Sequence, residues 1–213
     1  LSQMQKNSIL EISSWGDAKI GLSGVFSGAT NLTTLPAAPV ITSNNFTGMF
    51  YGCTALDINL SSWNVSAVTN FTDTFKQATS FNNGGEQLNW NTSSATIMSS
   101  MFYQAAAFNQ DISDWNLSNA SQLQNMFYQN STFDNGGVAL NWDDGFANNA
   151  NMSNMFAYSR AFNQDISNWD LSNVTNMNST FRDASAFNNG GEPLDWDDGF
   201  GTDANLTNMF NNA

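Results

Sequence analysis

The side chains most able to do chemistry in this chain are two pairs of adjacent carboxylates. Asp143-Asp144 and Asp197-Asp198 each follow a Trp and precede Gly-Phe, so the same acidic loop occurs twice. Calcium in proteins takes about six to eight oxygen ligands, mostly from carboxylates and loop carbonyls. Both loops are therefore candidate calcium sites, provided that neighbouring loops supply further oxygens. An ordinary Asp-Asp-Gly turn is the alternative.

A column of short polar residues, one per sequence repeat, forms a second candidate site. Evenly spaced amides and carboxylates of this kind can bind a repeating ligand such as a glycan, or can contact a protein surface. The alternative is a solvated face whose side chains hydrogen-bond to one another. The column consists of Asn64, Asn89, Asn116, Asn141, Asp170 and Asp195.

Catalysis has little support in the composition. Histidine is absent, which removes the usual general base and any Ser-His or Cys-His nucleophile pair. Two carboxyl groups alone can hydrolyse glycosides, but no feature of the sequence marks one of them as buried. We predict that the protein is not an enzyme, with glycan processing as a minor alternative.

A repeat anchored on phenylalanine must position these groups. Successive anchors are separated by 24 to 29 residues, a period typical of solenoids whose units bury apolar surface against their neighbours. Apolar side chains four residues before each anchor and small ones three residues after it complete a stripe at helical spacing. The stripe predicts a short helix or 3-10 turn in each coil. The anchors are Phe26, Phe50, Phe75, Phe102, Phe127, Phe156, Phe181 and Phe210.

A second column combines a large apolar residue six positions after the anchor with an Asn or Asp directly behind it. A short polar side chain in the same place in every coil favours a turn and a structural ladder. We predict a structural role for this asparagine column rather than ligand binding. Its members are Asp57, Asn82, Asn109, Asp134, Asn163 and Asn188.

Short strands are predicted beyond this turn. Trp115 and Leu117 in one coil, and Leu140 and Trp142 in the next, alternate with polar residues. This alternation is typical of a strand with one buried face, and stacked coils would pair such strands into a parallel sheet. The tryptophans are accordingly predicted in the core, not as a carbohydrate platform.

The repeats resemble those of a known family. The segment Trp169-Asp-Leu-Ser-Asn-Val-Thr-Asn-Met177, followed by Thr180-Phe-Arg-Asp-Ala-Ser-Ala-Phe-Asn188, is similar to BspA-like leucine-rich repeats. It also resembles the related family of unknown function common in mycoplasma lipoproteins. The resemblance covers residues from about 15 to 213, and implies a surface-exposed adhesion or binding solenoid without catalytic residues.

These observations predict one α/β repeat solenoid over residues 1–213, similar to a leucine-rich repeat. Each coil of about 25–29 residues is expected to hold one short parallel strand and a short helix or 3-10 turn. Residues 1–45 are expected to form an irregular coil or partial cap, because Pro36 and Pro39 occupy the strand region. Short and long repeats alternate over 46–213, and the chain is expected to be a fragment of a larger protein.

The charge and hydropathy of the chain narrow the range of possible partners. The formal net charge is −13, with only five Lys and Arg, so nucleic acid is not expected to bind. No apolar run reaches membrane-spanning length, and this segment is not expected to insert into a membrane. We predict a non-catalytic extracellular or cell-surface adhesion module that binds a glycan or a partner-cell protein. A structural spacer is the main alternative.

Overall fold

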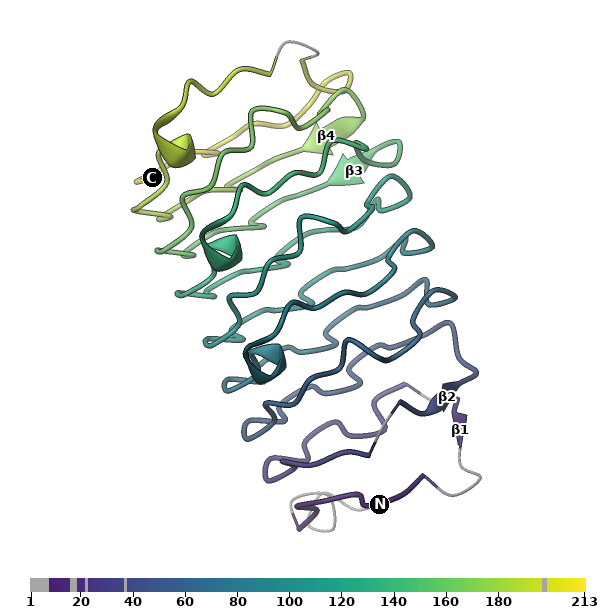
Figure 1. Cartoon of the computed structure of the whole chain (residues 1–213). Helices are drawn as coiled ribbons and strands as arrows, with labels where there is room; N and C mark the ends of the chain where they lie inside the picture. The colour runs from purple at the N-terminus through teal and green to yellow at the C-terminus, as the bar shows by residue number, and fades with distance from the viewer. Residues whose placement is uncertain (1–7, 16–18, 22, 37, 197–198) are drawn as a thin grey trace.

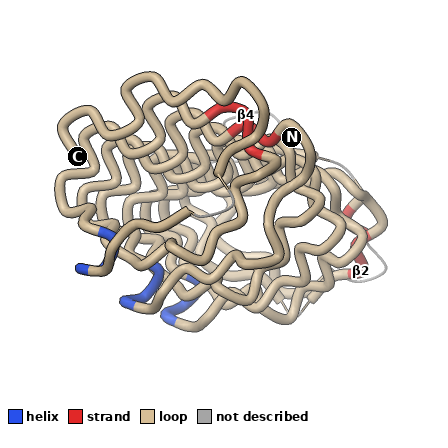
Figure 2. The backbone as a smooth tube through the Cα atoms, turned by 90° about the horizontal axis from the view of Figure 1, so that it is seen from above, coloured by secondary structure: helices blue, strands red, loops and turns tan. Residues whose placement is uncertain are grey.

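The backbone forms coils stacked in a single row. The computed structural model describes residues 8–15, 19–21, 23–36, 38–196 and 199–213. The two ends of the chain lie at opposite ends of the row (Figure 1). Seen from above, each coil follows nearly the same outline as the one before it (Figure 2). Residues about 25 apart in sequence are therefore neighbours in space.

Parallel pairing joins successive coils, and from Asn45 onward it forms one column. β1 (Lys19–Ile20) pairs with β2 (Val40–Ile41), and β3 (Ala150–Asn151) pairs with β4 (Val174–Asn176), both in parallel. Single parallel bridges extend the second pair toward both ends of the stack. From the second anchor onward, the bridged residue stands five positions before the anchor phenylalanine. The column is Asn45, Asn70, Ile97, Gln122, Asn151, Asn176 and Asn205.

Backbone hydrogen bonds between successive coils continue from this column past the anchor phenylalanine and form a ladder. In the coil of Phe127, alternate N–H groups donate to carbonyls of the next coil: Leu123 to Asn151 at 2.9 Å, Phe127 to Met155 at 2.8 Å and Gln129 to Ala157 at 2.9 Å. The equivalent bonds recur in every coil from that of Phe50 to that of Phe181. The predicted helix is therefore wrong, because helical N–H groups would bond within their own coil.

Consecutive β-turns replace the helix. Asn125 and Gln129 have φ of 59° and 55°, and Met126 and Asn130 donate to the carbonyls of Leu123 and Phe127 three residues earlier. A left-handed residue at the third position is the hallmark of a type II turn. Two such turns bury the same positions as a helix would, while alternate N–H groups stay directed at the next coil.

The predicted strands through Trp115–Leu117 and Leu140–Trp142 are also wrong. Trp115 and Ala120 donate to carbonyls within their own coil, at Ile112 and Leu117, and so form turns. The indole Nε1 of Trp115 donates to the carbonyl of Leu88 in the preceding coil at 2.9 Å. Side chains replace a backbone ladder at this edge. The predicted burial is confirmed, since Trp115 is 3% and Leu117 1% exposed.

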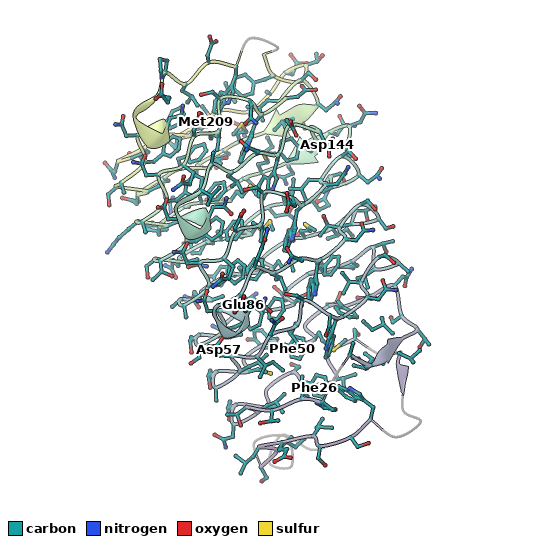
Figure 3. All side chains as sticks on the ribbon, in the orientation of Figure 1. Phe26, Phe50, Asp57, Glu86, Asp144 and Met209 are labelled. Carbon is teal, nitrogen blue, oxygen red and sulfur yellow. The ribbon has the colours of Figure 1, made fainter. Side chains whose placement is uncertain are left out.

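Phenylalanine rings fill the centre of the stack. Neighbouring anchor rings lie 5.3 to 5.6 Å apart and nearly parallel, in an unbroken column from Phe26 to Phe210. Figure 3 shows Phe26 and Phe50, which belong to two adjacent coils. A second column, from Phe81 to Phe187, packs against the anchors with centroids 3.9 to 4.4 Å away. Dispersion between these close-packed rings holds successive coils together.

From the coil of Phe75 onward, every second coil carries a 3-10 turn, and these turns lie along one edge of the stack (Figure 1). These are η1 (Asn83–Gly85), η2 (Asn135–Gly137) and η3 (Asn189–Gly191). The first residue of each is a buried Asn whose Oδ1 accepts a backbone N–H of the preceding coil, as Asn135 does from Ile112 at 2.9 Å. Each long coil is thereby joined to the short coil before it.

Candidate functional site

The asparagine column is structural, as predicted. Asn109 Oδ1 accepts the N–H groups of Asp134 at 2.7 Å and Gly136 at 3.0 Å, both in the next coil. Asp57 accepts from Asn82 and Gly84 in the same way. These side chains therefore satisfy the backbone of the following coil, rather than their own, which gives them a structural role.

The predicted polar column holds local turns together. Asn116 Oδ1 accepts the N–H of Ser118 at 3.1 Å and its hydroxyl at 2.6 Å, and Asn64 accepts from Ser66 in the same manner. Asn141 Oδ1 accepts from Asn168 Nδ2 at 3.2 Å. Asn64, Asn89, Asn141 and Asp195 are exposed, whereas Asn116 and Asp170 are half-buried.

Two carboxyl groups, one in the polar column and one near it in sequence, have lowered pKa values. Hydrogen bonds from the hydroxyl and N–H of Ser172 lower the pKa of Asp170. The N–H and hydroxyl of Ser167 lower the pKa of Asp165. Both groups are stabilised as carboxylates. A general acid for glycoside cleavage requires the opposite shift.

The Asp143-Asp144 loop lies at the surface, and Figure 3 labels Asp144. Asp143 and Asp144 are exposed, and Asp144 Oδ2 accepts a hydrogen bond from Asn116 Nδ2 at 2.8 Å. Asp197 and Asp198 lie outside the described residues. Across the described ranges, no group of three or more His, Cys, Asp or Glu side chains is placed to hold a metal ion.

All four tyrosines of the protein gather on one face. Tyr51, Tyr103 and Tyr128 directly follow an anchor, and Tyr158 is one position further along. The rings of Tyr103 and Tyr128 stack with centroids 4.9 Å apart and planes 12° apart. Tyr158 meets Tyr128 edge to face at 5.4 Å. The position directly after the anchor thus carries an aromatic residue in three coils.

Two cations complete this row. Lys76 Nζ lies 5.9 Å from the ring centroid of Tyr51 and 5.1 Å from that of Tyr103. Arg182 Cζ lies 4.9 Å from the ring of Tyr158, and Arg182 Nη2 donates to the Tyr158 hydroxyl at 2.6 Å. We name this set the tyrosine row: Tyr51, Lys76, Tyr103, Tyr128, Tyr158 and Arg182.

A groove of about 740 Å³ runs beside the tyrosine row. A ladder of amides continues past its edge, in which Gln77 Nε2 donates to Gln104 Oε1 at 3.0 Å and Gln104 Nε2 to Gln129 Oε1 at 2.6 Å. Burial, followed by the neighbouring Tyr158 and Tyr103, raises the pKa of Tyr128. The groove is lined by Lys76, Gln77, Ser100, Tyr103, Gln104, Asn125, Tyr128, Asn154 and Arg182.

This groove was not predicted from the sequence. The signal was the position of the tyrosines, since Tyr51, Tyr103 and Tyr128 occur only directly after an anchor phenylalanine. Lys76 and Arg182 occupy the same position in other coils. One aromatic or cationic residue per coil at a fixed offset is the pattern of an exposed stripe along a stack of coils.

Fold and site together define a repeat protein with a buried aromatic spine and a polar, tyrosine-lined groove on one face. Residues 20–142 and 139–213 match the family described as "Mycoplasma protein of unknown function, DUF285". The chain belongs to this family. No curated protein and no solved structure gives a significant match. Within the described residues, no helix has the length and apolar character needed to span a bilayer.

Proposed function

We propose that this chain is a non-catalytic binding module of an extracellular or cell-surface protein, and that it recognises a glycan or a protein ligand. The observation that carries the proposal is the tyrosine row with its adjoining groove. Binding sites on rigid scaffolds gather aromatic and polar side chains at otherwise solvated positions. The backbone ladder fixes the position of each coil, so the row is preorganised before any ligand arrives.

The tyrosine row is a better candidate than the polar column of Asn64 to Asp195. Oxygens of Asn64, Asn116, Asn141 and Asp170 are engaged in hydrogen bonds to nearby residues. In the tyrosine row the side chains contact one another instead, through ring stacking, cation–π contacts and the hydrogen bond from Arg182 to Tyr158. A row of aromatic side chains at the surface favours a binder over a plain spacer.

Absence of catalysis is part of the proposal. It rests on the lack of histidine and on the two lowered carboxyl pKa values at Asp165 and Asp170. The resemblance to BspA-like surface repeats supports the same class of function and an exposed location. A glycan-cleaving enzyme would need a carboxyl group held protonated near neutral pH.

Calcium at the Asp143-Asp144 loop, and at Asp197-Asp198, is a separate proposal. Asp143 and Asp144 offer exposed carboxylates, but further oxygens must come from elsewhere in the loop or from adjacent coils. An ion that binds only the folded chain raises the melting midpoint as its concentration rises. We expect millimolar calcium to raise the midpoint of the native chain, but not that of an Asp143→Asn, Asp144→Asn variant. An unchanged native midpoint removes the ion from the proposal.

Arrays of glycans and of cell-surface proteins test the binding function. We expect the native chain to bind a defined subset of spots and Tyr128→Ala to lose them, with any bound ligand recovered intact by mass spectrometry. The matched control is Asn116→Ala, Asn141→Ala, Asp170→Ala on the polar column, which should retain binding. Loss of binding in the control alone would move the site to that column. Blank arrays would favour the spacer, and a cleaved ligand would contradict the absence of catalysis.

A further inference from the structure

We propose that the groove beside the tyrosine row binds an uncharged polysaccharide segment that lies along the coil stack. This inference rests on the proposed function, because it names the ligand class of the same surface. The chemistry of the lining, the charges around it and the spacing of the coils all favour such a ligand.

The lining offers hydrogen bonds of both kinds. Gln77, Gln104, Asn125 and Asn154 present amides, and Ser100 presents a hydroxyl. An amide both donates and accepts, as a sugar hydroxyl does. Neighbouring hydroxyls on a sugar ring can therefore each find a partner among these groups. No carboxylate lines the groove, although the chain carries 18 Asp and Glu.

Charge disfavours ionic ligands. The two cations of the groove already have acidic neighbours: Lys76 Nζ lies 3.1 Å from Asp73 Oδ1, and Arg182 Nε lies 3.7 Å from Asp183 Oδ2. The net charge of −13 repels a polyanion. The lining carries no carboxylate of its own, and a cationic ligand would have to compete with Lys76 and Arg182 for Asp73 and Asp183. A neutral ligand avoids both difficulties.

The geometry of the tyrosines favours a sugar over a protein. The faces of Tyr103 and Tyr128 lie against each other at 4.9 Å, so the rings offer mainly their edges and hydroxyls to the groove. Protein partners usually anchor through large apolar or aromatic groups buried in desolvated pockets. An open groove lined by amides and hydroxyls supplies no such pocket.

The direction of the groove suits a linear chain. Its lining comes from successive coils between those of Lys76 and Arg182. Four coil steps of about 4.8 Å give a length of roughly 20 Å. A sugar unit in an extended chain advances by a similar step, so a short oligosaccharide can meet equivalent groups on successive coils.

Calorimetric titration with oligosaccharides of known charge tests this inference. The neutral probes are cello-, malto-, manno- and xylo-hexasaccharides, and the acidic probe is hexagalacturonate. We expect at least one neutral probe to bind, with an affinity unchanged between about 0.05 and 0.5 M salt, because no ionic contact would be screened. Hexagalacturonate should bind more weakly than that probe. Preferential binding of the acidic probe would overturn the inference.

Conservative variants locate the contact. Replacing Tyr103 and Tyr128 together by Phe keeps both rings and removes both hydroxyls, and should weaken binding roughly tenfold or more. The matched control is Ser66→Ala combined with Ser118→Ala, which also removes two hydroxyls but at positions outside the lining, and it should bind like the native chain. Equal binding by the double variant would overturn the inference. Failure of every neutral probe would also overturn it, and a hit on the protein arrays would then leave the proposed function standing. A blank in every arm contradicts both.

Discussion

Replacing Phe127 with alanine should lower the free energy of unfolding by about 3 to 5 kcal/mol, the range for removing a buried aromatic ring. Phe127 is fully buried and meets Phe102, Phe133 and Phe156 at 5.4, 3.9 and 5.3 Å. The cavity cannot close easily, because the backbone ladder fixes the distance between coils. Chemical denaturation measures the total loss, and amide hydrogen exchange should place it in the coils of Phe102 to Phe156.

The matched control is Phe210→Ala. Phe210 belongs to the same ring column but is 41% exposed, so its removal should cost much less. A loss at Phe127 no greater than that at Phe210 would show that the ring column does not hold the coils together.

Replacing Asn135 with alanine should be the most damaging change of a polar residue, at about 3 to 5 kcal/mol. Its Oδ1 accepts from the Ile112 N–H at 2.9 Å, and its Nδ2 donates to Ser113 Oγ and to the carbonyl of Val138, each at 2.9 Å. Each buried group left without a partner costs about 1 to 3 kcal/mol. Asn135 also has φ of 47°, where alanine adds about 1 to 2 kcal/mol of strain.

Asn135→Gly separates the two causes. Glycine adopts the left-handed backbone freely, so this variant loses the hydrogen bonds without the strain and should be the milder of the two. Denaturation of both variants beside the native chain gives the difference. A glycine variant as stable as the native chain would mean that the buried amide contributes nothing net.

Burial could be predicted from the sequence, whereas backbone conformation could not. The positions of Phe127, Trp115 and Asn109 follow from periodicity, because a repeated side chain must find the same environment in every coil. The prediction of a helix was wrong because two consecutive turns bury side chains at the same sequence spacing as a helix does. A clue existed in the first coils, where Gly48 and Gly52 stand at the positions that Asn125 and Gln129 occupy later with positive φ. Glycine there indicates a left-handed backbone.

The candidate site was harder to predict. Each coil contributes only one residue to the tyrosine row, and Lys76 and Arg182 share the column with the aromatic residues. The polar column attracted attention because Asn64 and Asn116 repeat the same residue type. That regularity arises from a turn in each coil, which Ser66 and Ser118 complete. In the more irregular column the side chains contact one another instead.

The amides of Asn83, Asn135 and Asn189 each join a long coil to a short one. Coils should therefore be added or removed only in pairs. Inserting or deleting a single coil would place two coils of one kind side by side and leave a buried amide facing a surface that was not shaped for it. Duplication or loss of whole pairs keeps every such contact. Engineered versions should therefore be shortened or lengthened by multiples of two coils.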